Sequence, residues 1–153
     1  MIRKLLIVSA LLALLGAAGW YGWRWYTTPV PPDVPLGGTS PEVKAMIEKG
    51  LEEVRRQPRS SKAWGELGLL LFANGYDKEA SSCLTQAERF APEEPRWPYH
   101  HGVVLGLSDR QAGFAKLRKA LELARRPEQQ VAVLSTLVVA LVGGGKSTRR
   151  SSP

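Results

Sequence analysis

The strongest constraint on the fold of this 153-residue chain is a spacing that recurs between positions 40 and 142. Gly102 follows Gly68, and Leu105 follows Leu71, at the same interval of about 34 residues. A second set recurs at an interval one place shorter, pairing Ala80 with Gly113, Leu84 with Leu117 and Ala87 with Ala120. Such a period is typical of stacked helical units, because each unit is too small to bury its apolar face alone.

The residues within one period carry a recognisable pattern. Trp64, Leu67, Gly68 and Leu71 are followed by Ala80, Leu84, Ala87 and Pro92. This spacing resembles that of the tetratricopeptide repeat (TPR) family, with Leu71 and Leu84 in place of aromatic residues, over about two thirds of the chain. The resemblance implies an all-α fold, a TPR-type α-solenoid of antiparallel helix pairs. In the second unit Pro98 and His101 replace the expected Trp and Leu, so that unit is degenerate.

Capping residues and prolines predict where the helices begin and end. Ser40 and Pro41 suit a helix start, Asp77 can cap a helix after the Asn74-Gly75 turn, and Pro92 follows a helix end. The predicted helices span 41–57, 61–73, 77–90, 96–107, 110–125 and 128–142. In the last one, Val131, Leu134, Ser135 and Val138 take the four repeat positions that Trp64, Leu67, Gly68 and Leu71 take in the first unit.

The N-terminal segment, 1–26, is predicted to anchor the chain in a membrane. Residues 5–23 carry no charge, and at about 1.5 Å per residue they are long enough to cross a bilayer. Arg3 and Lys4 precede them, which favours a cytoplasmic N-terminus and an exported, periplasmic or extracytoplasmic, repeat domain in a single-pass protein. The alternative is a signal peptide cleaved near Ala18, which would release a secreted protein.

Two further segments flank the predicted repeat domain at 40–142. Residues 27–39 contain four prolines and are predicted to form a semi-rigid stalk. Residues 143–153 form a polar tail that we expect to be disordered. Residues 140–147 fit a loose phosphate-loop pattern, but only six residues follow them and no nucleotide-binding domain surrounds them, so we interpret the match as chance.

Nothing in the sequence predicts an enzyme, a cofactor or a metal. Cys83 is the single cysteine and lies on a predicted core face, which favours a buried structural role. His100 and His101 are adjacent, so they point to different sides of a helix and cannot chelate one ion together. We expect His101 to pack in place of the leucine of the pattern.

Binding of a protein or peptide partner is therefore the predicted function. In the TPR family, ligands lie in a concave groove lined by the first helix of each pair. The matching positions are Lys62, Leu69, Phe72, Arg96, Tyr99 and Val103. An apolar floor with a basic rim suits an extended or helical peptide with acidic groups; the competing interpretation is that these residues only contact neighbouring helices. The alternatives in function are a periplasmic TPR factor of the cytochrome c biogenesis type and an accessory subunit that docks an enzyme.

Net charge and the last helix add two expectations. The formal charge is +7, but residues 40–128 hold 15 basic and 13 acidic residues, so most of the excess lies at the ends and no nucleic-acid partner is predicted. The last predicted helix carries an apolar flank of Val131, Leu134, Leu137, Val138 and Leu141. We expect self-association or a continuation in a longer repeat protein to cover it, the present chain being a truncated form.

Overall fold

The computed structural model describes the backbone of residues 29–147 and the side chains of residues 29–140. The predicted anchor at 1–26, the alternative cleavage near Ala18 and the last six residues of the tail lie outside these described residues. Within residues 29–147 the chain forms six helices and no strand, which confirms the all-α prediction. The helices are α2 (Pro41–Arg56), α3 (Ser61–Ala73), α4 (Asp77–Phe90), α5 (Arg96–Gly106), α6 (Arg110–Leu123) and α7 (Pro127–Ser147).

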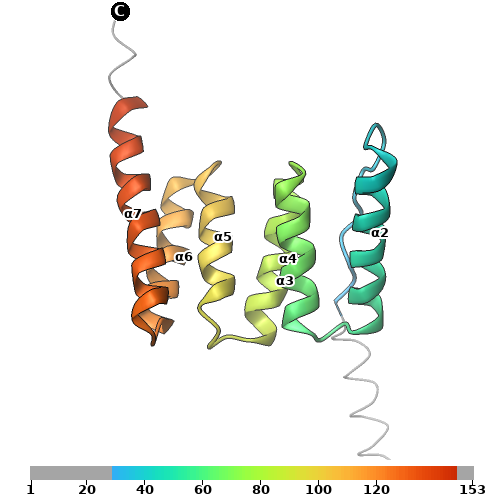
Figure 1. The fold of residues 1–153 in the computed structure, drawn as a ribbon, viewed down its shortest axis with the longest axis horizontal. Helices are drawn as coiled ribbons and strands as arrows, with labels where there is room; N and C mark the ends of the chain where they lie inside the picture. The colour runs from blue at the N-terminus through green and yellow to red at the C-terminus, as the bar shows by residue number, and fades with distance from the viewer. Residues whose placement is uncertain (1–28, 148–153) are drawn as a thin grey trace, which may run out of the picture. The chain divides into compact units, whose positions relative to one another are not determined.

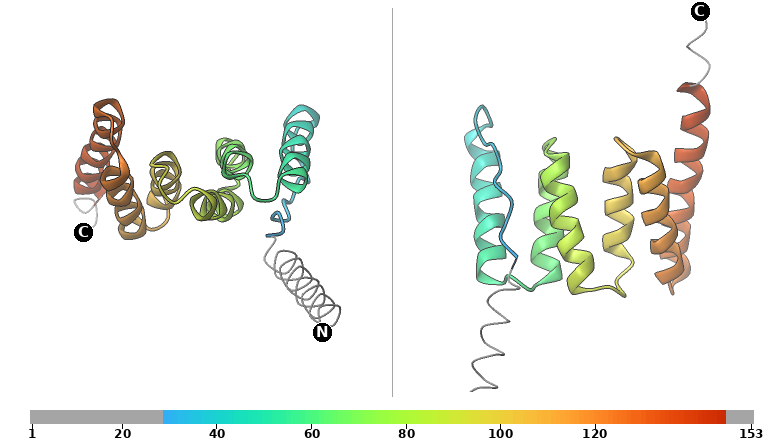
Figure 2. Two further views of the ribbon diagram at one scale, coloured as in Figure 1. Left: turned by 90° about the horizontal axis from the view of Figure 1, so that it is seen from below. Right: turned by 180° about the vertical axis from the view of Figure 1, so that it is seen from behind.

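The helices from α2 to α7 lie side by side in chain order, and consecutive helices run in opposite directions (Figures 1 and 2). The short connections account for this antiparallel arrangement, because two helices joined by only a few residues turn back on each other. Contacts are most extensive within two pairs, α3 with α4 and α5 with α6. No helix in the described part of the chain has both the length and the apolar character that spanning a bilayer needs.

Local capping explains most of the helix boundaries. The hydroxyl of Ser60 accepts a hydrogen bond from the amide of Ala63 at 3.2 Å, and the carboxylate of Asp109 accepts one from Ala112 at 3.0 Å. Gly75, between α3 and α4, has a φ of +81°, a left-handed conformation that favours glycine.

Two predicted details of the helix ends were wrong. Asp77 is the first residue of α4 rather than its cap, and Tyr76 takes the cap position without a side-chain hydrogen bond. The last helix begins at Pro127 and continues to Ser147, beyond the predicted end at 142. Residues 140–147 are consequently helical, which removes the loop that a phosphate-binding site would require.

The two helix pairs repeat the same close approach. A methyl group at Gly68 would lie 3.0 Å from Cγ of Leu84 on α4, and one at Gly102 would lie 2.8 Å from Cγ of Leu117 on α6. Both glycines also face a backbone carbonyl, at 3.3 Å for Ala80 and 3.0 Å for Gly113. Equivalent residues in the sequence period therefore make equivalent contacts in space, because a missing side chain lets the two backbones approach.

The core divides into two clusters within the described residues. The larger cluster joins α2, α3, α4 and α5, and its fully buried members include Ile47, Trp64, Leu67, Leu71 and Leu84. The smaller cluster consists of Leu117, Ala120 and Val133, from α6 and α7. Trp97 of α5 is buried against the backbone at Gly65 of α3, where a methyl group would overlap its ring. Pro98 occupies the repeat position at which the pattern expects a tryptophan, and Trp97, one residue earlier, is the aromatic residue that packs between α5 and α3.

The predicted stalk packs against the helices in its second half. Val34 is buried in the larger core cluster, and Leu36 packs against that cluster. The hydroxyl groups of Thr39 and Tyr76 lie 2.6 Å apart, and the Tyr76 hydroxyl donates to the carbonyl of Pro35 at 3.5 Å. Prolines prevent a regular helix here, but they leave alternate side chains free to bury apolar surface, so the segment does not behave as a simple spacer.

Candidate functional site

Arg96 and Tyr99 are the two predicted groove residues that the structure places in one hollow. This hollow, of about 320 Å³, lies between α5 and the first turns of α7. Its apolar side is made by Tyr99, Ala132 and Val133 together with Pro95. Its polar side is made by Glu94, Arg96, Arg126 and Gln129.

The Tyr99 ring is held in this hollow from two sides. Its hydroxyl lies 3.1 Å from the hydroxyl of Thr136 on α7, and its ring meets that of His100 edge to face at 5.0 Å. The guanidinium of Arg96 lies 4.8 Å from the centre of the Trp97 ring, within cation–π range. The hollow therefore presents an apolar floor beside two guanidinium groups, which suits a peptide with an apolar and an acidic side chain.

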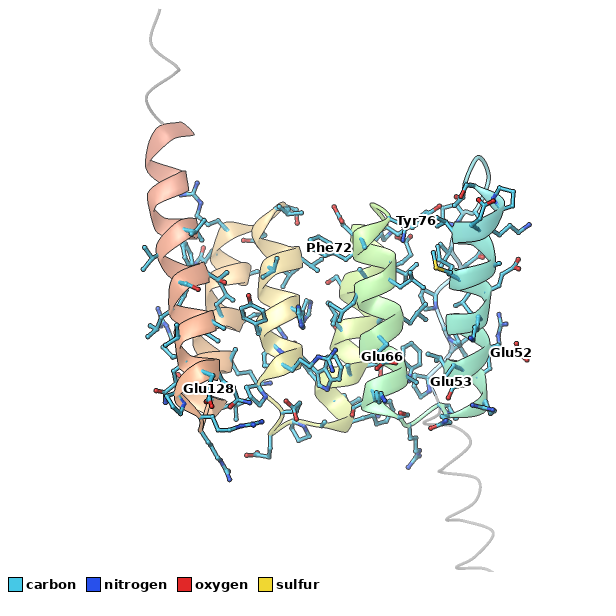
Figure 3. The ribbon with its side chains drawn as sticks, viewed as in Figure 1. Glu52, Glu53, Glu66, Phe72, Tyr76 and Glu128 are labelled. Carbon is cyan, nitrogen blue, oxygen red and sulfur yellow. The ribbon has the colours of Figure 1, made fainter. Side chains whose placement is uncertain are left out.

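Lys62 lies in a different hollow, of about 490 Å³, between α2 and α3. Apolar side chains of Met46, Leu67 and Leu70 line it, and its rim carries Lys49, Glu53, Lys62 and Glu66. Figure 3 shows Glu53 on α2 and Glu66 on α3, the two helices that border this hollow. Lys62 is held 3.8 Å from the Glu66 carboxylate, so its charge is already partly balanced.

The remaining three predicted groove residues lie elsewhere. Val103 lines a third hollow, of about 390 Å³, between α5, α6 and α7. Leu69 is half-buried, and Phe72 packs against the larger core cluster (Figure 3). Four of the six residues are thus distributed over three hollows, and Leu69 and Phe72 line none of them. Each hollow depends on all the helices around it, so a common repeat position does not ensure a common cavity.

The sequence did not identify the residues that α7 contributes beside Tyr99. Gln129, Ala132 and Val133 stand at the three- and four-residue spacing of one helix face. The more apolar flank of the same helix, which carries Val131, Leu134 and Val138, lies on a different side.

A buried polar cluster joins α4, α5 and α6. The carboxylate of Glu88 accepts hydrogen bonds from Nδ1 of His101 at 2.6 Å, from Nζ of Lys116 at 2.7 Å and from Nζ of Lys119 at 3.0 Å. The other ring nitrogen of His101 lies 2.9 Å from the hydroxyl of Ser81. Glu88 and His101 are both buried. His101 therefore does occupy the predicted core position, but as a hydrogen-bonded polar group rather than as a substitute for leucine.

The three hydrogen bonds keep Glu88 ionised. Burial acts to raise the pKa of its carboxyl group, but the donors on His101, Lys116 and Lys119 outweigh burial and lower the pKa from 4.5 to about 2. A carboxylate only accepts hydrogen bonds, so the proton between Glu88 and His101 resides on Nδ1. The charge of Glu88 is compensated inside the fold, so we interpret this cluster as structural: it joins α4, α5 and α6.

Two other groups bear on possible chemistry. Burial, with a smaller contribution from the charge of Glu79, raises the pKa of the Cys83 thiol to about 12, so the thiolate needed for nucleophilic attack does not form near neutral pH. Burial and the nearby charge of Arg96 lower the pKa of His100. No group of three or more His, Cys, Asp or Glu residues that could hold a metal ion occurs among the described residues.

Comparison with known proteins leaves the family open. No protein-family model matches the chain, and a search of curated proteins finds no significant relative.

Proposed function

We propose that the chain is a non-enzymatic TPR-like scaffold that binds a protein or peptide partner. The observation that carries this proposal is the repeated packing at Gly68 and Gly102, since equivalent glycines contact equivalent residues of the following helix. Repeated helix pairs of this kind stack into a solenoid whose open face is used for binding. The uncharged residues 5–23 would hold the scaffold at a membrane, with the helices on the exported side, and so raise the local concentration of the partner.

The hollow at Arg96 and Tyr99 is the binding site that we favour. Its guanidinium groups and apolar floor complement an acidic peptide with at least one apolar side chain. The hollow at Lys62 has two lysines and two glutamates on its rim, so it offers less net attraction for an acidic ligand. The partner class is therefore an acidic peptide segment, in an extended or helical conformation.

A blocking substitution tests the site without disturbing the core. Ala132 is exposed at the edge of the hollow, so we expect Ala132→Trp to fill it while the helices remain folded. Ser82 is exposed on α4, away from the hollow, and Ser82→Trp adds the same ring there as a matched control. The full chain, in membranes of its source, is cross-linked to its neighbours, and the adducts are compared between the two variants.

Adducts that disappear in Ala132→Trp and persist in Ser82→Trp would support the site. Equal adducts in both variants would show that the partner binds elsewhere. Circular dichroism of each purified variant checks the helical content, so a loss of adducts through unfolding is recognised.

A further inference from the structure

Helix α7 carries apolar side chains on two faces. Val133 belongs to the smaller core cluster and Leu137 packs against it, on the side that faces the rest of the domain. Val131, Leu134 and Val138 stand on another side and are 65%, 47% and 57% exposed. Their spacing of three and four residues places them in one stripe along the helix. Together with Ser135 they form what we call the α7 stripe.

The same positions are covered in the two earlier units. The α7 stripe follows Pro98, His101, Gly102 and Leu105 of α5 at the shorter of the two repeat intervals, and the first three of these are buried and the fourth is half-buried. The corresponding residues of α3, which are Trp64, Leu67, Gly68 and Leu71, are all buried. In α3 this face packs on α4, and in α5 it packs on α6. Among the described residues, no helix packs on the equivalent face of α7.

We propose that the α7 stripe pairs with the α7 stripe of a second copy of this chain, in antiparallel orientation. A two-fold axis between Leu134 and Ser135 places Val131 opposite Val138 of the other copy and Leu134 opposite its Ser135. Each large side chain then meets a small one at the centre, and two valines meet at each end. Ser135 holds the position of Gly68 and Gly102, where the helices of this chain approach closely.

The absence of charge along most of α7 favours a second copy of the chain as the partner. The sequence from Gln129 to Gly145 contains no charged residue, so two copies of the helix meet without repulsion. The antiparallel orientation also sets the negative C-terminal end of each helix dipole beside the positive N-terminal end of the other.

At the other end of the row of helices, the segment before α2 argues against a different arrangement, in which α7 of one copy docks on α2 of the next. Val34 and Leu36 of the preceding segment already pack against the core cluster to which α2 contributes. A segment of its own chain thus lies against part of α2, whereas the α7 stripe is exposed. A contact of this kind is isologous and closes at a dimer rather than extending into a fibre. It does not depend on the peptide hollow proposed above.

The mass of the full chain in mild detergent, measured by sedimentation velocity over a range of concentrations, tests the proposal. We expect a protein mass twice the 16.8 kDa of one chain for the wild type. Val138→Glu, which puts a charge in the stripe, should lose the doubled mass. Ser82→Glu is the control, because Ser82 is exposed on α4, outside α7, and the same charge placed there should leave the doubled mass intact.

Cysteine pairs test the orientation. Ser135→Cys lies near the axis and should form a disulfide-linked dimer on mild oxidation. Val131→Cys alone should not, because its two copies would be about 10 Å apart along the helix, beyond disulfide reach. A mixture of Val131→Cys and Val138→Cys chains should cross-link.

Three results on the purified chain would overturn the proposal. They are a wild-type chain that remains a monomer, a doubled mass that Val138→Glu leaves intact, and Val131→Cys dimers, which would indicate a parallel pair. Cross-linking of Ser135→Cys to a different polypeptide in membranes, with no dimer formed, would likewise assign the stripe to another partner.

Discussion

Replacing Glu88 by glutamine tests whether the buried cluster stabilises the fold through charge. Glutamine keeps the shape of the side chain but removes the negative charge that His101, Lys116 and Lys119 share. The lowering of the pKa of Glu88 from 4.5 to about 2 corresponds to about 3 kcal/mol of free energy of unfolding at neutral pH. We expect the variant to lose about 2 to 3 kcal/mol at pH 7, since the lysines retain partial access to water.

The pH dependence provides a sharper test than the loss itself. The folded pKa of Glu88 lies below its unfolded value, so its contribution is complete above about pH 4.5 and is lost as the pH falls towards 2. The difference in unfolding free energy between wild type and Glu88→Gln should therefore be constant near neutral pH and shrink steadily below pH 4.5.

Urea unfolding of the full chain, followed by circular dichroism at a series of pH values, measures this difference. Glu93→Gln is the control, because Glu93 pairs with Arg125 at 3.9 Å with both side chains largely exposed, and such pairs contribute little. Equal stability losses for the two variants at pH 7, or a Glu88→Gln difference that persists unchanged to pH 2, would refute the reasoning.

Two further predictions concern packing. Gly65→Ala should destabilise the fold by about 1 to 3 kcal/mol in thermal unfolding, because the added methyl group overlaps the Trp97 ring. Gly106→Ala is the control: its methyl group has open space around it, so the variant should be neutral or stabilising. Tyr76→Phe should lower the free energy of unfolding by about 1 kcal/mol and speed proteolysis of the segment before α2, because it removes the hydrogen bond with Thr39. An unchanged rate of cleavage would mean that apolar burial alone holds this segment.

Helix existence and most helix boundaries followed from local features of the sequence. The structure has α3 and α4 at the residues predicted, since a serine cap, a left-handed glycine and a following proline act within a few residues of themselves. Gly68 and Gly102 recur at the repeat interval, and the structure has helices in close approach at both, because only a missing side chain permits that contact. In α3 the repeat positions are buried as the pattern indicates, whereas Val131, Leu134 and Val138 of the predicted α7 flank are exposed.

Which side chains meet across helices was decided by the tertiary structure. The sequence pattern did not single out Glu88, because only the packing of three helices brings His101, Lys116 and Lys119 around it. The predicted groove residues share a repeat position, yet only Arg96 and Tyr99 share a hollow, since cavities depend on the distances and angles between helices. A period in the sequence predicts which positions of a helix are apolar, because that pattern lies within one helix. Polar partners and hollows depend on several helices together, so only their arrangement in space determines them.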